Sequence, residues 1–256
     1  QFTQPLAFLR ELVQNSLDAG SNRVDVDVHY DDEQKTAVVV VADTGEGMDR
    51  EIVDRQLTRL FSSSKEGDFT KIGKFGIGFV SVFAVQPTAV VVDTARGGEA
   101  WRVIFHPDRT FDRVALQEMI EGTRVQVFVP TPRQKFEAFR RECRQTVIFW
   151  CRHCEVEIRF DGQAINQAFA LMTPYEYRHV VPGTEVVVAP SVDSRPFFGF
   201  YNRGLTLLEG REPTLPQVTF KIRSRYLEHT LTRDQVLQDQ HFEKAMSIVR
   251  DVAFKK

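Results

Sequence analysis

The sequence has few cysteines, no long apolar run and no excess of either charge. Three cysteines in 256 residues exclude a disulfide-stapled scaffold, and no apolar run approaches the roughly 20 residues of a membrane span. Lys and Arg number 33 against 35 Asp and Glu, and the net charge of −2 argues against nonspecific nucleic-acid binding, which needs a basic field. With 42% apolar and 27% charged residues, the composition is typical of a soluble globular protein of one large or two modest domains.

The cysteines fit a buried core better than a metal site. Cys151 and Cys154 form a C-x-x-C pair with Cys143 upstream, but a structural zinc site takes four ligands and no second pair is present. Cys143 and Cys154 instead recur at helical spacing with Phe136, Phe139, Val147 and Trp150. We therefore expect small core residues, and such sparse, odd cysteine usage is typical of the reducing cytoplasm.

Hydrophobic periodicity predicts alternating helices and strands. The expected helices cover 5–19, 49–60, 134–151 and about 240–255, and the expected strands cover 24–30, 37–42, 88–94, 100–105, 123–129, 155–160, 184–189, 197–201 and 217–223. Residues 79–84 fit either a helical turn or a strand. Because Pro130 and Pro132 interrupt both helix and sheet, we expect two domains, 1–130 and 131–256.

A first group of polar residues lies on the opening helix. Glu11, Asn15 and Asp18 are spaced by four and three residues, which puts them on one helix face. Taken alone, this pattern is most often an ordinary solvated face. Asn is a poor helix former, and its place mid-helix is an argument for a functional role.

Two glycine-containing loops follow. Asp43-Thr44-Gly45-Glu46-Gly47-Met48 ends a buried strand, either as an ordinary turn or as a corner where the backbone approaches a ligand. Gly73-Lys74-Phe75-Gly76-Ile77-Gly78-Phe79 offers backbone amides to phosphate. Its glycine spacing matches neither a Walker A motif nor a dinucleotide fingerprint, so it predicts a phosphate loop of another kind.

These three segments, in this order and spacing, resemble the superfamily of gyrase, the ninety-kilodalton heat-shock chaperones, histidine kinases and mismatch-repair clamps. Its shared ATP site is the Bergerat fold. F-G-I-G-F at 75–79 and E-G-T-R-V-Q-V-F-V at 121–129 are most similar to the chaperone branch, and the resemblance covers most of residues 5–130. In the second half, L-T-R-D-Q-V-L-Q-D at 231–239 is similar to the Ser-Arg-Glu catalytic loop of the chaperone middle domain, with Thr232 and Asp234 as departures.

The resemblance implies an α+β fold. A two-layer Bergerat sandwich, with a mixed, mostly antiparallel sheet covered by helices, would be followed by a second α/β domain. The chain begins with Gln1 and ends where family members continue, so we expect a fragment of a protein that is a homodimer at full length. Its client or partner protein is not indicated.

The resemblance also implies a Mg²⁺-dependent ATP site. Glu11 matches the general base, Asn15 the Mg²⁺ ligand, and Asp43 the carboxylate that accepts the adenine amino group, with Thr123 supporting Asp43 through its hydroxyl and water. Arg233 matches a finger that reaches the γ-phosphate of ATP from the second domain. The implied nucleotide-binding residues are Asn15, Asp18, Ala19, Asp43, Gly47, Met48, Gly76, Ile77, Gly78, Phe79 and Thr123.

The segment at about 61–78 would be the lid over this ATP site. Lys65, Lys71 and Lys74 lie in or beside it, and one of them could reach a phosphate or all could be solvated.

Three other functions are weighed against a chaperone-like ATPase. V-V-A-D-T-G at 40–45 and V-V-V-D-T-A at 90–95 resemble aspartic-protease turns, with Asp43 and Asp93 as the pair, but this leaves the helix motif unexplained. A DNA-linked clamp ATPase is disfavoured by the near-neutral charge. A noncatalytic nucleotide-gated module is disfavoured by the presence of Glu11.

Overall fold

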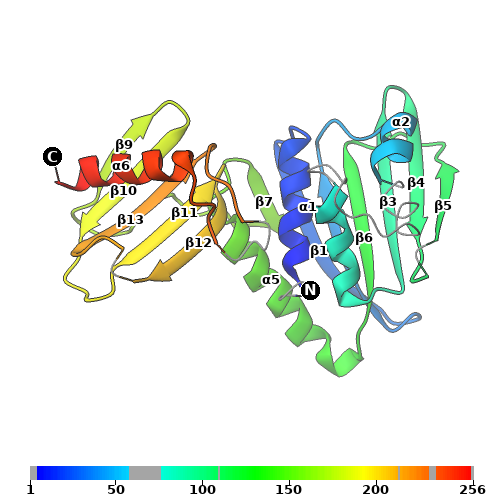
Figure 1. The fold of residues 1–256 in the computed structure, drawn as a ribbon. Helices are drawn as coiled ribbons and strands as arrows, with labels where there is room; N and C mark the ends of the chain where they lie inside the picture. The colour runs from blue at the N-terminus through cyan, green and yellow to red at the C-terminus, as the bar shows by residue number, and fades with distance from the viewer. Residues whose placement is uncertain (1–4, 58–75, 109, 213, 231–234, 255–256) are drawn as a thin grey trace. The chain divides into compact units, whose positions relative to one another are not determined.

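A computed structural model describes residues 5–57, 76–108, 110–212, 214–230 and 235–254 of the chain. The chain divides into two compact units, the first formed by 1–148 with 156–165 and the second by 149–155 with 166–256. The α+β class that the resemblance implies is confirmed, with one mixed sheet in each unit (Figure 1).

The sheet of the first unit is antiparallel except where β1 and β7 pair in parallel. In sheet order its strands are β5 (Phe111–Ala115), β4 (Glu99–Phe105), β3 (Ala89–Arg96), β6 (Thr123–Pro130), β2 (Thr36–Asp43), β1 (Arg23–Asp31), β7 (Glu157–Phe160) and β8 (Gln163–Ala164). Strand β1 alternates buried valines with polar residues, whereas β2 is buried almost throughout. Both strands have a neighbour on each side, so the difference lies in their faces: one face of β1 is partly exposed, whereas both faces of β2 are covered and need apolar residues.

Helices cover the face of this sheet on which the alternate valines of β1 are buried. Helix α1 (Ala7–Asp18) packs against β2 and against α4 (Gly76–Val80), and α1 and α4 lie side by side over the sheet (Figure 1). The remaining helical segments of the unit are α2 (Arg50–Ile52), the π-helix η1 (Val53–Leu57), the 3-10 helices η4 (Ser81–Val85) and η5 (Arg133–Lys135), and most of α5 (Phe136–Cys151).

Strand β7 belongs to the first unit, although it follows the expected domain boundary at residue 130. It pairs with β1 through Val24 opposite Ile158 and Val26 opposite Phe160, and both partners on β7 are buried. The chain therefore returns to complete the first sheet before it builds the second unit. No local pattern in the strand itself signals this return, because parallel pairing joins residues more than 130 positions apart.

The second unit is a five-stranded sheet with one long helix. In sheet order the strands are β12 (Leu205–Arg211), β11 (Phe197–Asn202), β13 (Val218–Ser224), β10 (Thr184–Pro190) and β9 (Tyr177–Val181). Helix α6 (Gln240–Phe254) contacts β10 and β13 (Figure 1). Its Met246 and Val249 complete an apolar core with Phe220 and Ile222.

Several local expectations differ from the observed elements. Residues 79–84, left open between helix and strand, are helical as the end of α4 and the start of η4. Within the expected helix 49–60, the described part is a short α-helical turn followed by a π-helix. Strands β5, β9 and β12 are additional to the expected strands. In exposed strands such as β9, apolar and polar residues do not alternate clearly, so the sequence gives little indication of a strand.

The three cysteines are buried, as the helical spacing predicts. Cys143 and Cys151 are fully enclosed and Cys154 is 6% exposed, and burial raises the pKa of the Cys143 thiol to about 12. A thiol in such surroundings stays protonated and behaves as a small apolar side chain. Over the described part of the chain, no helix is both long and apolar enough to cross a membrane.

A buried polar cluster lies on the face of the second sheet that α6 leaves free. His153 is 3% exposed; its Nδ1 lies 3.3 Å from the carbonyl oxygen of Gln167, and its Nε2 lies 3.0 Å from Nζ of Lys221. The side chain of Arg152 also donates to Nε2, at 3.4 Å. Burial, and then the charge of Lys221, lowers the pKa of His153 to about 4. The folded protein therefore holds a neutral imidazole whose Nε2 accepts hydrogen bonds from two cationic side chains.

This arrangement makes the second unit acid-sensitive. The unfolded imidazole has a pKa near 6.5, above the folded value of about 4, so only the unfolded chain takes up this proton in that window. The stabilising contribution is complete above pH 6.5 and is lost as the pH falls toward 4, by up to about 3 kcal/mol at 1.36 kcal/mol per pKa unit.

We expect His153→Gln, which can still donate to Gln167 and accept from Lys221, to flatten the loss of stability between pH 7 and pH 4. Urea unfolding at a series of pH values measures this loss. His241→Gln, at an exposed position of the same unit, is the control and should follow the wild-type profile. Parallel pH profiles for wild type and His153→Gln would contradict the assignment.

Candidate functional site

A cavity of about 330 Å³ opens in the first unit beside α1. The lining residues are Leu12, Asn15, Ser16, Asp18, Ala19, Val41, Asp43, Glu46, Gly47, Met48, Ile52, Leu57, Phe79, Val92, Arg96, Thr123 and Val125. Apolar side chains from the helix and the sheet form most of this surface, and a few polar groups converge on it. This combination is typical of a site for a flat, largely apolar ligand whose orientation is fixed by specific hydrogen bonds.

The carboxylate of Asp43, at the end of the buried strand β2, is held by three donors. Its Oδ1 accepts from the backbone N–H of Gly45 at 2.9 Å and of Thr123 at 3.1 Å, and its Oδ2 accepts from the hydroxyl of Ser16 at 2.9 Å. One donor comes from its own loop, one from α1 and one from β6. Asp43 lines the cavity, and a carboxylate oxygen can accept two hydrogen bonds, so Oδ2 has the capacity for one acceptor bond beyond that from Ser16.

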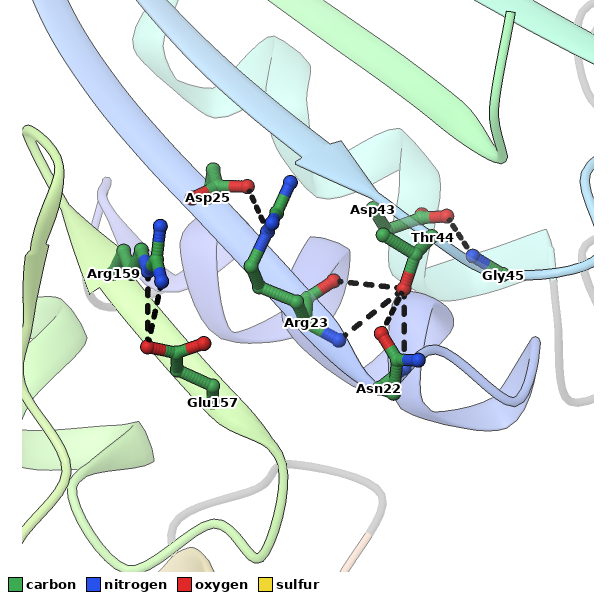
Figure 2. Close-up of polar contacts among 8 residues, drawn as sticks. All are labelled: Asn22, Arg23, Asp25, Asp43, Thr44, Gly45, Glu157 and Arg159. Carbon is green, nitrogen blue, oxygen red and sulfur yellow. Dashed lines mark hydrogen bonds and ion pairs between the residues drawn. The ribbon is translucent and has the colours of Figure 1, made fainter.

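The neighbouring Thr44 fastens the loop to the start of β1. Its Oγ1 accepts from the backbone N–H groups of Asn22 and Arg23, both at 3.2 Å, and donates to the side-chain oxygen of Asn22 at 2.8 Å (Figure 2). Figure 2 also shows the bond from Gly45 to Asp43 on the other side of the same corner. Asp43 thus lines the cavity, whereas the side chain of Thr44 is turned to Asn22 and Arg23 at the start of β1.

Thr94, fully buried on β3, joins the loop to β6. Its hydroxyl accepts from the backbone N–H of Met48 at 2.8 Å, lies 3.0 Å from the hydroxyl of Thr123, and donates to the carbonyl of Gly122 at 3.4 Å. Thr123 therefore supports Asp43 through its amide, while its hydroxyl is engaged with Thr94.

Glu11 lies beside the cavity and not in its lining. The side chain is 7% exposed and its Oε1 forms an ion pair of 3.1 Å with Arg10, itself 8% exposed. Oε2 faces α4 so closely that a Cβ on Gly78 would lie 2.6 Å from it. A side chain at position 78 would therefore displace this carboxylate oxygen, and glycine fits here without moving it.

Eight of the residues expected in the nucleotide site line the cavity: Asn15, Asp18, Ala19, Asp43, Gly47, Met48, Phe79 and Thr123. Gly78 contacts Glu11, and Gly76 and Ile77 form the start of α4. Arg233 lies outside the described residues, as do most of the expected lid segment 61–78 and its three lysines Lys65, Lys71 and Lys74.

Ser16, Thr94 and Arg10 also belong to the surroundings of the cavity, although no motif in the sequence marks them. Ser16 follows Asn15 directly, and a small hydroxyl residue on the buried side of a helix, four residues after Leu12, is a weak signal for a role. Arg10 is an arginine within the buried part of α1, and its position next to Glu11 could have marked the pair. Thr94 carries no local signal, because its partners come from two other segments.

Asp43 and Asp93 do not form a shared site. Asp93, 5% exposed, makes a two-point ion pair with Arg102 at 2.6 and 2.8 Å. Its neighbour Thr94 points to the cavity loop, and successive residues of a strand point to opposite faces. The paired-carboxylate geometry of an aspartic protease is therefore excluded for these two residues.

A mostly antiparallel sheet, a helix with buried Glu11 beside it, and an aspartate at the head of an apolar cavity define an ATP-binding domain of the Bergerat type. The sequence profile of the histidine kinase-, DNA gyrase B- and HSP90-like ATPases matches residues 5–130. This domain of the chain belongs to that family. Membership in a family of ATPases implies that the domain binds adenine nucleotide.

Relatives of two kinds are similar to the chain. The chaperone protein HtpG of Chlorobaculum tepidum is 27% identical over 203 residues, covering 66% of this chain and 32% of the relative. The DNA mismatch repair protein MutL of Baumannia cicadellinicola is 31% identical over 144 residues, covering 52% and 23%. The HtpG of Aromatoleum aromaticum is 38% identical over 120 residues, covering 36% and 18%. The chain thus spans about a third or less of the length of these relatives.

We expect Thr94→Val to lower the free energy of unfolding of the first unit by about 1–3 kcal/mol, since it leaves the Met48 amide and the Thr123 hydroxyl without their buried partner at nearly unchanged volume. Denaturant unfolding measures the change, and Thr94→Ser, which keeps the hydroxyl, should cost less. A valine variant as stable as wild type would show that these bonds contribute nothing net.

Proposed function

We propose that the cavity binds ATP and ADP with the adenine base at Asp43. The observation that carries this is the arrangement of three donors on Asp43, a charged acceptor that lines a largely apolar cavity and that can accept one more hydrogen bond. The adenine amino group is a donor and suits that acceptor, whereas guanine presents an oxygen at the same place. Leu12, Val41 and Val125 would pack against the two faces of the base.

The phosphates would extend along α1 toward Glu11 and Gly78. Asn15 lines the cavity one turn from Glu11, half-buried, and its side-chain oxygen is a ligand type that Mg²⁺ accepts. Mg²⁺ commonly takes one or two protein oxygens and completes its shell with phosphate oxygens and water, so a single Asn fits. When bound, Mg²⁺ would neutralise phosphate charge.

We propose hydrolysis of ATP to ADP and phosphate with Glu11 as general base. Its carboxylate would take the proton of the attacking water, and Arg10 would hold it in orientation through the buried ion pair. A side chain at position 78 would crowd Oε2, so the glycine there lets the carboxylate keep its place beside α4. We propose that Arg233 contributes from the second half of the chain, on the resemblance alone.

Of the two kinds of relative, the chaperones are the better guide to the function of the whole protein. The match to the Chlorobaculum HtpG covers 66% of the chain, more than residues 5–130 alone, which are about half of it, while the match to the Baumannia MutL covers 52%. We propose an ATP-driven, heat-shock-chaperone-like cytoplasmic protein that dimerises at full length and acts on client proteins. The second candidate, a mismatch-repair-like clamp, has the MutL similarity in its favour.

Asp43→Asn tests the base site. The new amide can keep Oδ1 bonded to Gly45 and Thr123 and can donate to Ser16, whose hydroxyl can turn to the carbonyl of Leu12 at 3.0 Å, so the fold is retained. The cavity then meets an N–H instead of a lone pair. We expect ADP affinity in calorimetry to fall roughly 10–100-fold, the value of a hydrogen bond to a charged group.

The matched control for this substitution is Asp25→Asn on β1, outside the cavity, which should bind ADP as wild type does. Unchanged ADP affinity in Asp43→Asn would remove Asp43 from the site.

Glu11→Gln tests catalysis. The shape and the bond to Arg10 are largely kept while the base is lost, so we expect ADP affinity within about twofold of wild type and turnover lower by roughly 10²–10⁴-fold. Phosphate release under single-turnover conditions, in the longest available form of the protein, measures it. Glu137→Gln on the exposed side of α5 is the control, and equal rates in wild type and Glu11→Gln would refute the role.

Binding to duplex DNA distinguishes the two candidate functions. A mismatch-repair-like clamp would bind DNA, with its ATPase rate responding to it, whereas a chaperone-like protein should show neither effect in 0.1 M salt, where nonspecific attraction is weak.

A further inference from the structure

The rim of the cavity carries an ion pair that no part of the proposed site uses. Glu46, in the loop after β2, and Arg96, the last residue of β3, approach to 3.0 Å between Oε2 and Nη2, and both line the cavity. Their side chains are 66% and 41% exposed. Among the lining residues that the structure describes, Arg96 is the sole cation.

This pair lies at the Asp43 end of the cavity. Gly47 packs on the end of β3 so tightly that a Cβ there would overlap the carbonyl oxygen of Ala95, the residue before Arg96. The backbone N–H of Glu46 donates to the carbonyl of Ala19 at 3.0 Å, at the C-terminal end of α1. Glu11 lies eight residues earlier on this helix, or about 12 Å at 1.5 Å per residue. Arg96 is therefore placed for the base and not for the γ-phosphate.

The chemistry of adenine supplies a partner for Arg96. The amino group that Asp43 would accept is flanked on the ring by acceptor nitrogens, N1 on one side and N7 on the other. A guanidinium presents five donors in a fixed fork and is always charged. An exposed ion pair contributes little to stability, so Arg96 can turn a donor toward the base while one oxygen of Glu46 still holds it.

We propose that Arg96 is a base-reading residue that donates to a ring nitrogen of adenine, with Glu46 as its positioning residue. Asp43 then accepts from the amino group while Arg96 donates beside it, and together they read a donor and an acceptor on one edge of the base. The inference rests on the proposed nucleotide function and assigns specificity at that same site.

Calorimetry with ADP, 7-deaza-ADP and 1-deaza-ADP tests it. We expect Arg96→Met to weaken ADP about 5–20-fold, since a partly exposed charged hydrogen bond is lost. Each analogue lacks one of the two ring nitrogens. We expect the analogue that lacks the nitrogen contacted by Arg96 to bind the wild-type protein more weakly than ADP by a similar factor. Its affinity should not change further in Arg96→Met. Arg96→Lys should rescue poorly, because it lacks the fork.

A second substitution tests the role of Glu46. Glu46→Gln should weaken ADP a few-fold in the wild-type background and have no further effect in Arg96→Met, because a positioning residue acts only through its partner.

Arg23→Met is the matched control, since Arg23 forms a 2.8 Å pair with Asp25, is 42% exposed, and lies outside the cavity (Figure 2). The inference is overturned if Arg96→Met leaves ADP affinity unchanged, or if it weakens ADP and both analogues equally, which would indicate a general charge effect. Either result with intact wild-type ADP binding leaves the nucleotide function standing, whereas absence of wild-type binding refutes that function first.

Discussion

The side chain of Asp43 joins three segments that are distant in sequence. A carboxylate at the inner end of a buried strand must be compensated by donors, because burying an uncompensated charge is costly. The donors come from Ser16 on α1, from the amide of Gly45 and from the amide of Thr123 on β6. This requirement fixes the rotation of α1 against the sheet, and with it the position of every polar residue that the helix carries.

Helix α1 then sets the spacing of the site. Glu11 faces Gly78, Asn15 and Ser16 follow one turn later, and Ala19 receives the loop that carries Glu46. An elongated ligand can meet a proton acceptor at one end and a hydrogen-bonding edge at the other. The separation is set by a helical rise, so it does not depend on loop conformations.

The two units use polar groups differently. In the first unit, Asp43 and Thr94 accept hydrogen bonds from the backbone amides of Gly45 and Met48 and so hold the loop that borders the cavity. In the second, His153 is enclosed with cations and is held neutral, a structural arrangement in which burial governs the pKa. The first unit carries the family match, and the relatives to which the chain is similar are named for two different tasks, chaperoning and DNA mismatch repair.

The sequence by itself determined the elements whose signals are local. The Glu11, Asn15 and Asp18 spacing, the buried strand before Asp43 and the glycines around Phe79 are set by helix period, strand burial and backbone freedom, all readable within a few residues. The bonds of Asp43 to Ser16 and Thr123, the return of β7 to β1, and the meeting of Glu46 with Arg96 depend on the tertiary structure. Each of these joins residues that the chain separates by dozens of positions, and a hydrogen bond or ion pair between such residues leaves no periodic trace in the sequence.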